Sequence, residues 1–132
     1  MNAFLVDLEN TPGALAAVAE ALGAKGINIT GISGASCGGS GRAALTTSDE
    51  AATRTALSAM GATFQELEFV EASLAHTPGS LGKAARRLAD AGVNIEAIMP
   101  TGMAGNDITV GFATSDAAKA REVLAMSASS VR

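Results

Sequence analysis

One stretch of this sequence is written twice, and that repeat constrains the fold more than any other feature. Residues 8–32 align with residues 74–98 after a shift of 66 positions, and 11 of the 25 aligned positions are identical. Because one half-length unit must explain both copies, we predict two units, residues 1–68 and 69–132, with the same order of elements. The identical pairs are Leu8/Leu74, Thr11/Thr77, Pro12/Pro78, Gly13/Gly79, Leu15/Leu81, Ala19/Ala85, Leu22/Leu88, Gly26/Gly92, Asn28/Asn94, Ile29/Ile95 and Ile32/Ile98.

Each copy is predicted to begin with a strand, a turn and a helix. Residues 4–8 and 70–74 alternate apolar with other side chains, as a strand with one buried face does. Thr-Pro-Gly follows in both copies, where Thr is expected to cap the helix and Pro to be its first residue. A glycine that suits a left-handed C-terminal cap then ends each helix. The inward helix positions are expected to be Leu15, Val18, Ala19 and Leu22, repeated as Leu81, Ala84, Ala85 and Leu88, and the capping glycines are Gly26 and Gly92.

The rest of each unit is predicted to be two strands, a second helix and a last strand. Each unit is therefore expected to be βαββαβ, a four-stranded antiparallel sheet with two helices on one face. The second helices should bury Ala56, Leu57 and Met60, or Ala120, Val123 and Leu124. The predicted segments are strands at 27–32 and 93–98, turn-rich stretches at 34–41 and 100–107, strands at 42–47 and 108–114, helix starts at 48–50 and 115–116, and last strands at 62–68 and 128–132.

Composition and charge exclude several classes of protein. The chain is 48% hydrophobic and 17% charged, which is typical of a globular protein. Its net charge is −4, all of it in residues 1–68, and only 3% of residues are aromatic, so nucleic-acid binding is not expected. The pair Arg86-Arg87 is more typical of a solvated helix face than of a phosphate clamp. No apolar run reaches the roughly 18 residues of a membrane span, and the N-terminal residues lack a charged leader region, so a cytoplasmic protein is expected.

The turn before the first helix of each unit is the best candidate for a ligand site. A helix N-terminus offers unpaired N–H groups and a partial positive charge to a carboxylate or phosphate. Gly13 and Gly79 would leave that backbone open, and the preceding Asn10 or His76 could bond an ammonium or carboxylate group. An Asn fifteen residues after each glycine adds a donor and an acceptor. Together these groups suit a small zwitterion; the alternative is that Thr-Pro-Gly is only a helix start.

Other chemistry finds less support in the residues. The stretch 34–41 is rich in glycine, but it lacks the Gly-Lys-Ser/Thr ending of a phosphate loop and is expected to be a hairpin loop. His76 is the single histidine, so no Ser/His/Asp arrangement can form. Cys37 is the single cysteine and is interpreted as an incidental loop thiol. Asp49 and Glu50 point apart as neighbours on a helix. No catalytic residue, metal site or cofactor is predicted.

The chain resembles tandem ACT-domain proteins over essentially its full length. The resemblance is carried by residues 8–15 with 26–29, and by residues 75–81 with 92–95. It implies a ferredoxin-like fold for each unit and a module that binds amino acids to regulate metabolic enzymes, such as aspartokinases and phosphoglycerate dehydrogenases. It also implies that two units pair edge to edge into an eight-stranded sheet, with the effector at the seam. The long glycine-rich hairpin and the short last strand depart from the family pattern.

The resemblance also implies which residues bind the ligand. The turn of one unit would face the second strand of the other, so that two different sites form. One site would join Asn10, Gly13 and Ala14 with Asn94, and the other would join His76, Gly79 and Ser80 with Asn28. The full set of candidate ligand-binding residues is Asn10, Thr11, Gly13, Ala14, Asn28 and Ile29, with His76, Thr77, Gly79, Ser80, Asn94 and Ile95.

Three functions are compared. The first is a non-catalytic amino-acid sensor that acts on a metabolic enzyme or regulator by population shift, with a homodimer compatible with the sequence. The second is a small regulatory subunit of a biosynthetic enzyme such as acetolactate synthase or aspartokinase. The third is a ferredoxin-like enzyme of the acylphosphatase type. That enzyme needs an Arg in an anion-binding loop, and neither Thr-Pro-Gly turn contains one.

Overall fold

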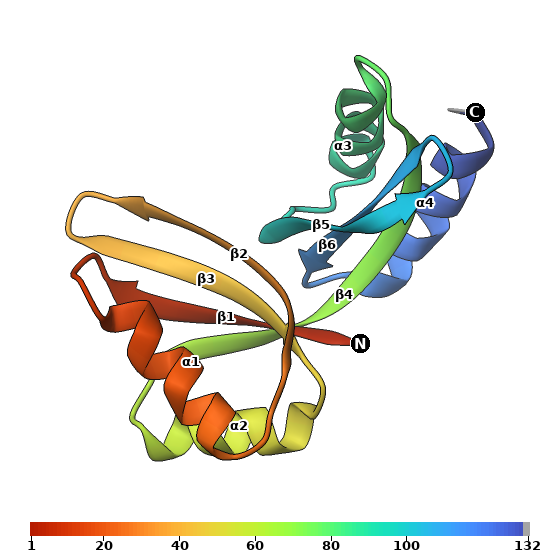
Figure 1. Cartoon of the computed structure of the whole chain (residues 1–132). Helices are drawn as coiled ribbons and strands as arrows, with labels where there is room; N and C mark the ends of the chain where they lie inside the picture. Colours follow the sequence, from red (N-terminus) through yellow and green to blue (C-terminus); the bar gives the residue numbers. More distant parts are fainter. Residues whose placement is uncertain (131–132) are drawn as a thin grey trace. The chain divides into compact units, whose positions relative to one another are not determined.

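The computed structural model describes residues 1–130, which form two compact units (Figure 1). The first unit is Asn2–Leu67, and the second is Met1 with the residues from Glu68 onward. The elements, in chain order, are β1 (Asn2–Glu9), α1 (Ala14–Ala24), β2 (Ile29–Cys37), β3 (Ser40–Thr47), α2 (Glu50–Ala59), β4 (Phe64–Ala75), α3 (Ser80–Asp90), β5 (Ala97–Ala104), β6 (Asp107–Thr114) and α4 (Ala117–Ser130).

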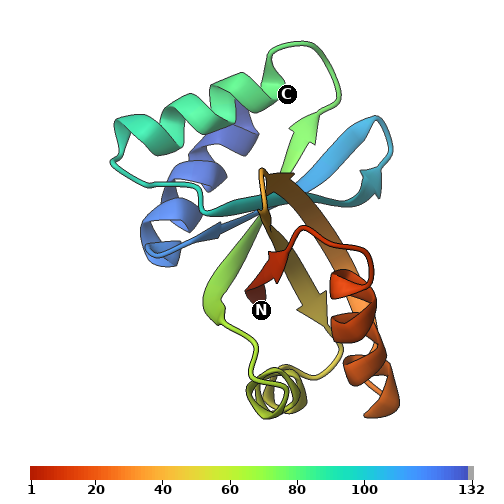
Figure 2. The ribbon, with the colours of Figure 1, turned by 90° about the vertical axis from the view of Figure 1, so that its left-hand side faces the viewer.

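In the first unit, α1 and α2 pack on one face of an antiparallel sheet with the strand order β2-β3-β1-β4 (Figure 2). The core lies between that face and the two helices. Phe4 and Leu45 pair across β1 and β3, and both side chains are fully buried against Leu22 of α1 and Leu57 of α2. The predicted βαββαβ order of this unit is thus the observed one.

The second unit repeats this packing with one strand fewer. Its strands follow the order β4-β6-β5, and its core places Leu74 and Phe112 of the sheet against Leu88 of α3 and Leu124 of α4. The prediction of a fourth strand at 128–132 is wrong, because α4 continues through Ser130; residues 131 and 132 lie outside the described residues. The preceding residues 124–128, Leu-Ala-Met-Ser-Ala, contain three kinds of good helix former, and no β-branched residue follows them before residue 131, so the sequence lets the helix continue.

β4 belongs to both units and is longer than predicted. The last strand of the first unit and the first strand of the second were expected as separate segments, but Phe64–Ala75 is one continuous strand. No Gly or Pro interrupts it. Over residues 1–130 the chain therefore forms six antiparallel strands in the order β2-β3-β1-β4-β6-β5, and not the eight that two four-stranded units would give.

The Thr-Pro-Gly segments form turns that precede the helices. Gly13 has φ 91° and ψ −11°, Gly79 has φ 91° and ψ −12°, and no side chain caps either helix. The N–H of Ala14 reaches the carbonyl of Thr11 at 3.3 Å, so Pro and Gly occupy the two central positions of a type II turn. The predicted Thr cap and Pro start are therefore wrong. This position requires glycine, because its φ is positive and a residue with a Cβ would be strained in that conformation.

The predicted helix ends are confirmed, but three predicted inward positions are wrong. At the end of α1 the N–H of Ile27 donates to the carbonyl of Leu22 at 3.1 Å, and Val93 and Leu88 repeat the bond at the end of α3 at 2.8 Å. This is a Schellman motif, with Gly26 or Gly92 in the left-handed position. The remaining inward positions are buried or partly buried, whereas the exposed exceptions are Leu15 (44%), Leu81 (49%) and Met60 (39%).

The glycine-rich stretch is mostly strand. β2 runs through Cys37 and pairs with β3 from Ser40 onward, which leaves Gly38-Gly39 as the whole turn. The second hairpin is equally tight at residues 105–106. The predicted turn-rich stretches are thus wrong in extent, and the predicted second strands start late, at Ile29 and Ala97. Glycine lowers local strand propensity, but the cross-strand hydrogen bonds of a two-residue hairpin overcome it.

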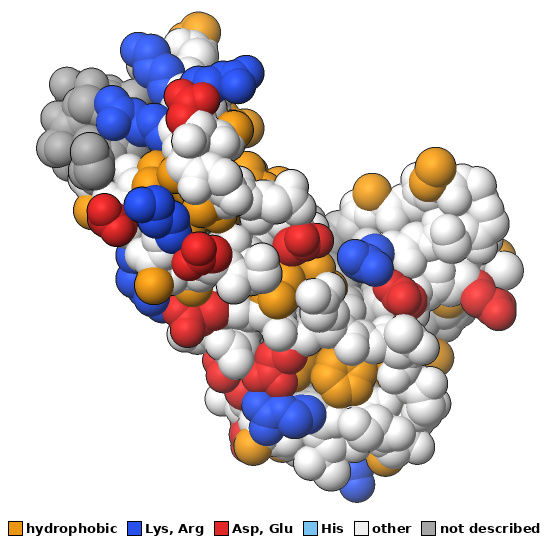
Figure 3. Space-filling model, turned by 180° about the vertical axis from the view of Figure 1, so that it is seen from behind, with side chains coloured by type: hydrophobic (Ala, Val, Ile, Leu, Met, Phe, Trp, Pro, Cys, Tyr) orange, Lys and Arg blue, Asp and Glu red, His pale blue; other side chains and the backbone are white. Residues whose placement is uncertain are grey.

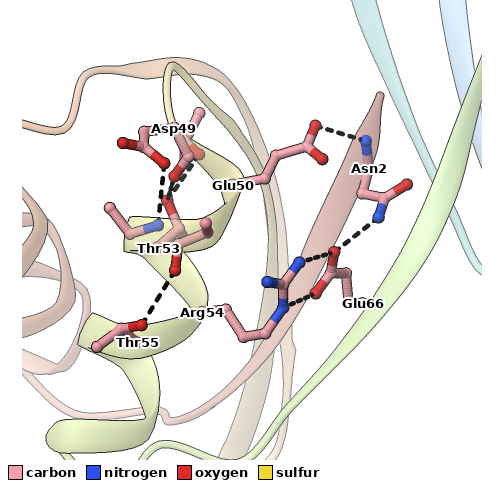
Figure 4. Close-up of polar contacts among 10 residues, drawn as sticks. Asn2, Asp49, Glu50, Thr53, Arg54, Thr55 and Glu66 are labelled. Carbon is pink, nitrogen blue, oxygen red and sulfur yellow. Dashed lines mark hydrogen bonds and ion pairs between the residues drawn. The ribbon is translucent and has the colours of Figure 1, made fainter.

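A polar network ties β1, α2 and β4 of the first unit together (Figure 4). The Arg54 guanidinium donates to both carboxylate oxygens of Glu66, at 2.7 Å from Nε and 2.8 Å from Nη2. Asn2 adds a bond from Nδ2 to Glu66 at 2.6 Å, and its backbone N–H donates to Glu50 at 2.9 Å. The Arg54 hydrogen bond, opposed by partial burial and aided by Asn2, holds the pKa of Glu66 below its ordinary value.

We expect this network to make the first unit less stable in acid. Because the folded pKa of Glu66 is lowered, its contribution is complete above the unfolded pKa and is lost as the pH falls below about 4.3 toward the folded value. Glu66→Gln should lower the free energy of unfolding at pH 7 by up to about 1 kcal/mol. Urea titrations at pH 7 and pH 3 should show a smaller loss between the two pH values for the variant. An identical loss in both proteins would contradict the prediction.

Candidate functional site

The predicted turn of the first unit opens onto a hollow. This hollow has a volume of about 380 Å³ and lies between the start of α1 and the outer parts of β2 and β3. Three of the predicted residues line it, namely Asn10, Thr11 and Ala14. Pockets for small ligands typically have about 300–1,000 Å³ and combine apolar walls with a few polar groups. Its apolar wall includes Leu8, Leu15, Ile32 and Ala43, and its polar groups include Glu9, Ser36 and Arg42.

Asn10 fastens the turn to the tip of the β2–β3 hairpin. Its side-chain amide donates to the carbonyl of Gly38 at 2.9 Å, and its backbone N–H donates to Gly39 at 3.0 Å. The amide oxygen is then left as an acceptor beside the hollow, since the nitrogen is engaged. The residue therefore shapes the site and offers one oxygen to a ligand group such as an ammonium.

Glu9 and Arg42 are two charged residues that line this hollow and were not among the predicted site residues. Arg42 of β3 pairs with Asp7 of β1, with 3.0 Å between Nε and Oδ1, and both side chains are about half exposed. Glu9 and Arg42 also line a second, larger hollow of about 700 Å³, together with Asp7, Cys37 and Thr63. The signal for Arg42 would have been the register of β1 with β3, which places it opposite Asp7.

The turn of the second unit is built differently around the same backbone. His76 is exposed, and its backbone N–H donates to the carbonyl of Asn106 at 3.2 Å, where Asn10 uses Gly39. Thr77 and Ser80 share a hydrogen bond of 3.0 Å between their hydroxyl oxygens, and Ser80 is buried. Ala14 stands at the corresponding place in the first unit and offers no hydroxyl. The polar character of the two turns therefore differs at two positions.

The two repeated Asn-Ile pairs lie outside the turn hollow of the first unit. Asn28 exchanges backbone and hydroxyl bonds with Ser48, both of 2.9 Å, and Asn94 donates its amide to Glu96 at 2.9 Å. Both Asn residues are exposed. Ile29 and Ile95 are partly buried and pack against the core of their own unit. Each isoleucine thus has a structural role, and neither Asn28 nor Ile29 lines the hollow beside Asn10.

Three other features of the described residues bear on function. Among residues 1–130 no cluster of three or more His, Cys, Asp or Glu side chains is placed to hold a metal ion. Within the same residues no helix has the length and apolar character that crossing a membrane requires. Cys37 is exposed and free, and it is the last residue of β2 and not part of a loop.

Comparison with known proteins finds one ACT-domain match within the first unit and several structures of similar fold. The family model of the ACT domain matches residues 3–60, from β1 to the end of α2. The structure of protein BT0572 from Bacteroides thetaiotaomicron is similar, with 27% identity and a TM-score of 0.75, over 95% of this chain and 86% of that one. The ligand-free regulatory subunit of aspartate kinase from Thermus thermophilus is also similar, with 23% identity and a TM-score of 0.66, over 96% of this chain and 90% of that one. No curated protein matches.

A third similar structure is that of aspartokinase alpha and beta subunits, with 20% identity and a TM-score of 0.67, over 96% of this chain and 91% of that one. At these identities the two aspartokinase structures show a shared fold. Because the match covers 96% of the chain in both cases, the likeness in fold includes α3, β5, β6 and most of α4 as well as the first unit.

Proposed function

We propose that this chain is a non-catalytic regulatory protein of two ACT-like units, residues 1–68 and 69–132, that binds a free amino acid. The observation that carries the proposal is the hollow beside Asn10, which lies within the segment that matches the ACT domain. It combines an apolar wall with a free amide oxygen and two oppositely charged side chains, Glu9 and Arg42. These groups can bind the ammonium and the carboxylate of one zwitterion.

In this proposal the two units cooperate in binding. Asn10, Gly13 and Ala14 form one site with Asn94 of the other unit, and His76, Gly79 and Ser80 form the second with Asn28. A ligand that contacts both units favours the arrangement in which its two sets of contacts are made together. The different polar groups at the two turns, Asn10 with Ala14 against His76 with Ser80, support unequal affinities at the two sites.

The second candidate is a regulatory subunit of an amino-acid biosynthetic enzyme. It is favoured by the fold that this chain shares with the regulatory subunit of aspartate kinase over 90% of that subunit's length. This candidate contains the first one and adds a catalytic partner. Copurification of the tagged chain with an aspartokinase or acetolactate synthase from its own cells would distinguish it from a stand-alone sensor.

Screening the twenty amino acids by thermal unfolding tests the proposal. A ligand at a hundred times its dissociation constant should stabilise the protein by roughly 2.7 kcal/mol, which raises the unfolding midpoint by several degrees. Asn10→Ala and Asn94→Ala should then weaken the same site, and His76→Ala and Asn28→Ala the other. The midpoint without ligand must be compared for Asn10→Ala, since this variant also loses the bond to Gly38. Absence of any amino-acid effect would refute the proposal, and equal weakening of both sites by each variant would refute the crossed pairing.

A further inference from the structure

The first helices of the two units have the same fold and opposite charge. α1 and α3 each have 11 residues, start at the same type of turn and end in the same cap. At three corresponding outer positions, however, α3 carries Lys83, Arg86 and Arg87, where α1 carries Ala17, Glu20 and Ala21. The fold does not need these cations, because α1 forms the same helix without them. They are therefore a property that distinguishes the second unit.

The basic side chains surround a hollow. Its volume is about 550 Å³, and it is lined by Gly79 and Gly82 together with Lys83, Arg86 and Arg87. These positions lie on neighbouring turns of one helix face, so the charges converge on one place. Nothing lies within 4 Å of where a Cβ would stand on either glycine, which leaves open space at the base of the hollow. Several Lys and Arg side chains gather on the end of the second unit that carries α3 (Figure 3).

Two of the three cations on this face have no acidic partner among the described residues. Arg42, Arg54, Lys119 and Arg121 each form an ion pair with a carboxylate, whereas Lys83 and Arg86 form none within residues 1–130. The first turn of α3 contains no acidic residue, and no side chain caps the helix, so the partial positive charge of the helix start adds to the charge of the three cations. Asp90 ends the helix one turn beyond Arg86 and does not line the hollow.

We propose that the outer face of α3 binds a small molecule that carries phosphate groups. Two guanidinium groups and an ammonium can each donate to phosphate oxygens, and the arginine forks match them in bidentate geometry. A helix start with free N–H groups adds to the attraction. The lining contains no aromatic side chain on which a nucleic-acid base could stack, and three cations are few for a polynucleotide. This site lies within the second unit, and Gly79 is the one residue of its lining that also belongs to a proposed amino-acid site.

Calorimetric titration of the whole chain with inorganic pyrophosphate tests this proposal. In the variant Lys83→Ala, Arg86→Glu, Arg87→Ala, the helix takes the residues of α1, so it should still fold, and circular dichroism would verify this. Its affinity for pyrophosphate should fall by about tenfold or more, as expected when several charge-assisted bonds are lost. The control variant Lys25→Glu, Lys119→Glu changes the net charge by the same four units elsewhere and should bind pyrophosphate within about twofold of the original.

Three results would overturn the inference. The first is the absence of pyrophosphate binding to the original chain at low ionic strength. The second is an equal loss in the control variant, which would show a diffuse attraction to the whole protein. The third is a glutamate-rich peptide that binds more tightly than pyrophosphate and loses its affinity in the α3 variant, which would show that this face docks an acidic protein.

Discussion

Replacing Leu22 by alanine should destabilise the first unit by about 2–5 kcal/mol. Leu22 of α1 is fully buried and packs against Phe4, Leu45 and Leu57. Its removal leaves a cavity that the close-packed sheet and helices can fill only in part, so the loss exceeds the transfer free energy of the missing methyl groups. Urea unfolding followed by far-ultraviolet circular dichroism would measure this change.

Leu15→Ala is the matched control for this prediction. Leu15 lies two turns earlier on the same helix and, like Leu22, was predicted to face inward, yet it is 44% exposed. Its truncation removes less buried surface than that of Leu22, and we expect a change within about 1 kcal/mol. Equal losses for the two variants would show that Leu15 is buried in solution. Because Leu15 lines the hollow beside Asn10, its truncation should instead alter amino-acid binding.

The internal repeat allowed most of the first unit to be predicted. Gly26 and Gly92 identified the helix ends, and the alternation of residues 4–8 identified the central strand. The exposure of Leu15 could not be predicted, because helical periodicity shows which face of the helix is apolar but not which residues of that face contact the core. Leu15 is not part of the core cluster, and it lines the hollow together with residues of β2 and β3.

Strand extent depends on pairing and was therefore predicted less well. Residues 34–37 carry turn-forming residues, but they pair with residues 40–43 in a regular register. Local propensity contains no information on such non-local bonds. The same limit explains Arg42, whose place beside Asp7 and the hollow follows from the register of β1 with β3. The Ala and Met content at the end of α4, by contrast, favours a helix. We predicted a strand there because the repeat required a counterpart to the last strand of the first unit.

Three residues of the predicted site line one hollow, and their role in binding stays a prediction. The residues next to Thr-Pro-Gly do line a hollow in the first unit, because a turn before a helix leaves space at the helix start. The reason for the glycine was different from the expected one: Gly13 adopts φ 91° in a type II turn and is needed with or without a ligand. The crossed roles of Asn28 and Asn94 remain a prediction, and the ligand screen with paired variants decides it.

Gly111→Ala should destabilise the second unit by about 1–3 kcal/mol, because the added methyl group overlaps the ring of Phe69. Phe69 of β4 and Gly111 of β6 share one face of the sheet, since Phe69 pairs with Ala113 and Gly111 with Glu71. A glycine inside a strand is often found where another group approaches its backbone closely. Urea unfolding of the single variant would measure the cost.

The first unit shows how this cost can be cancelled. At the corresponding places of β1 and β3 it has Ala3 and Ala44, so two small side chains replace one large ring and one glycine. In a Phe69→Ala background, Gly111→Ala should therefore stabilise by about 0.5–1 kcal/mol, the usual gain when alanine replaces a strand glycine. The effect of one substitution thus changes sign with the other, a coupling that a double-mutant cycle measures directly. Additive effects would contradict this prediction. They would mean that the ring of Phe69 can move away from residue 111 at no cost in free energy, and that the contact between Phe69 and Gly111 does not stabilise the sheet.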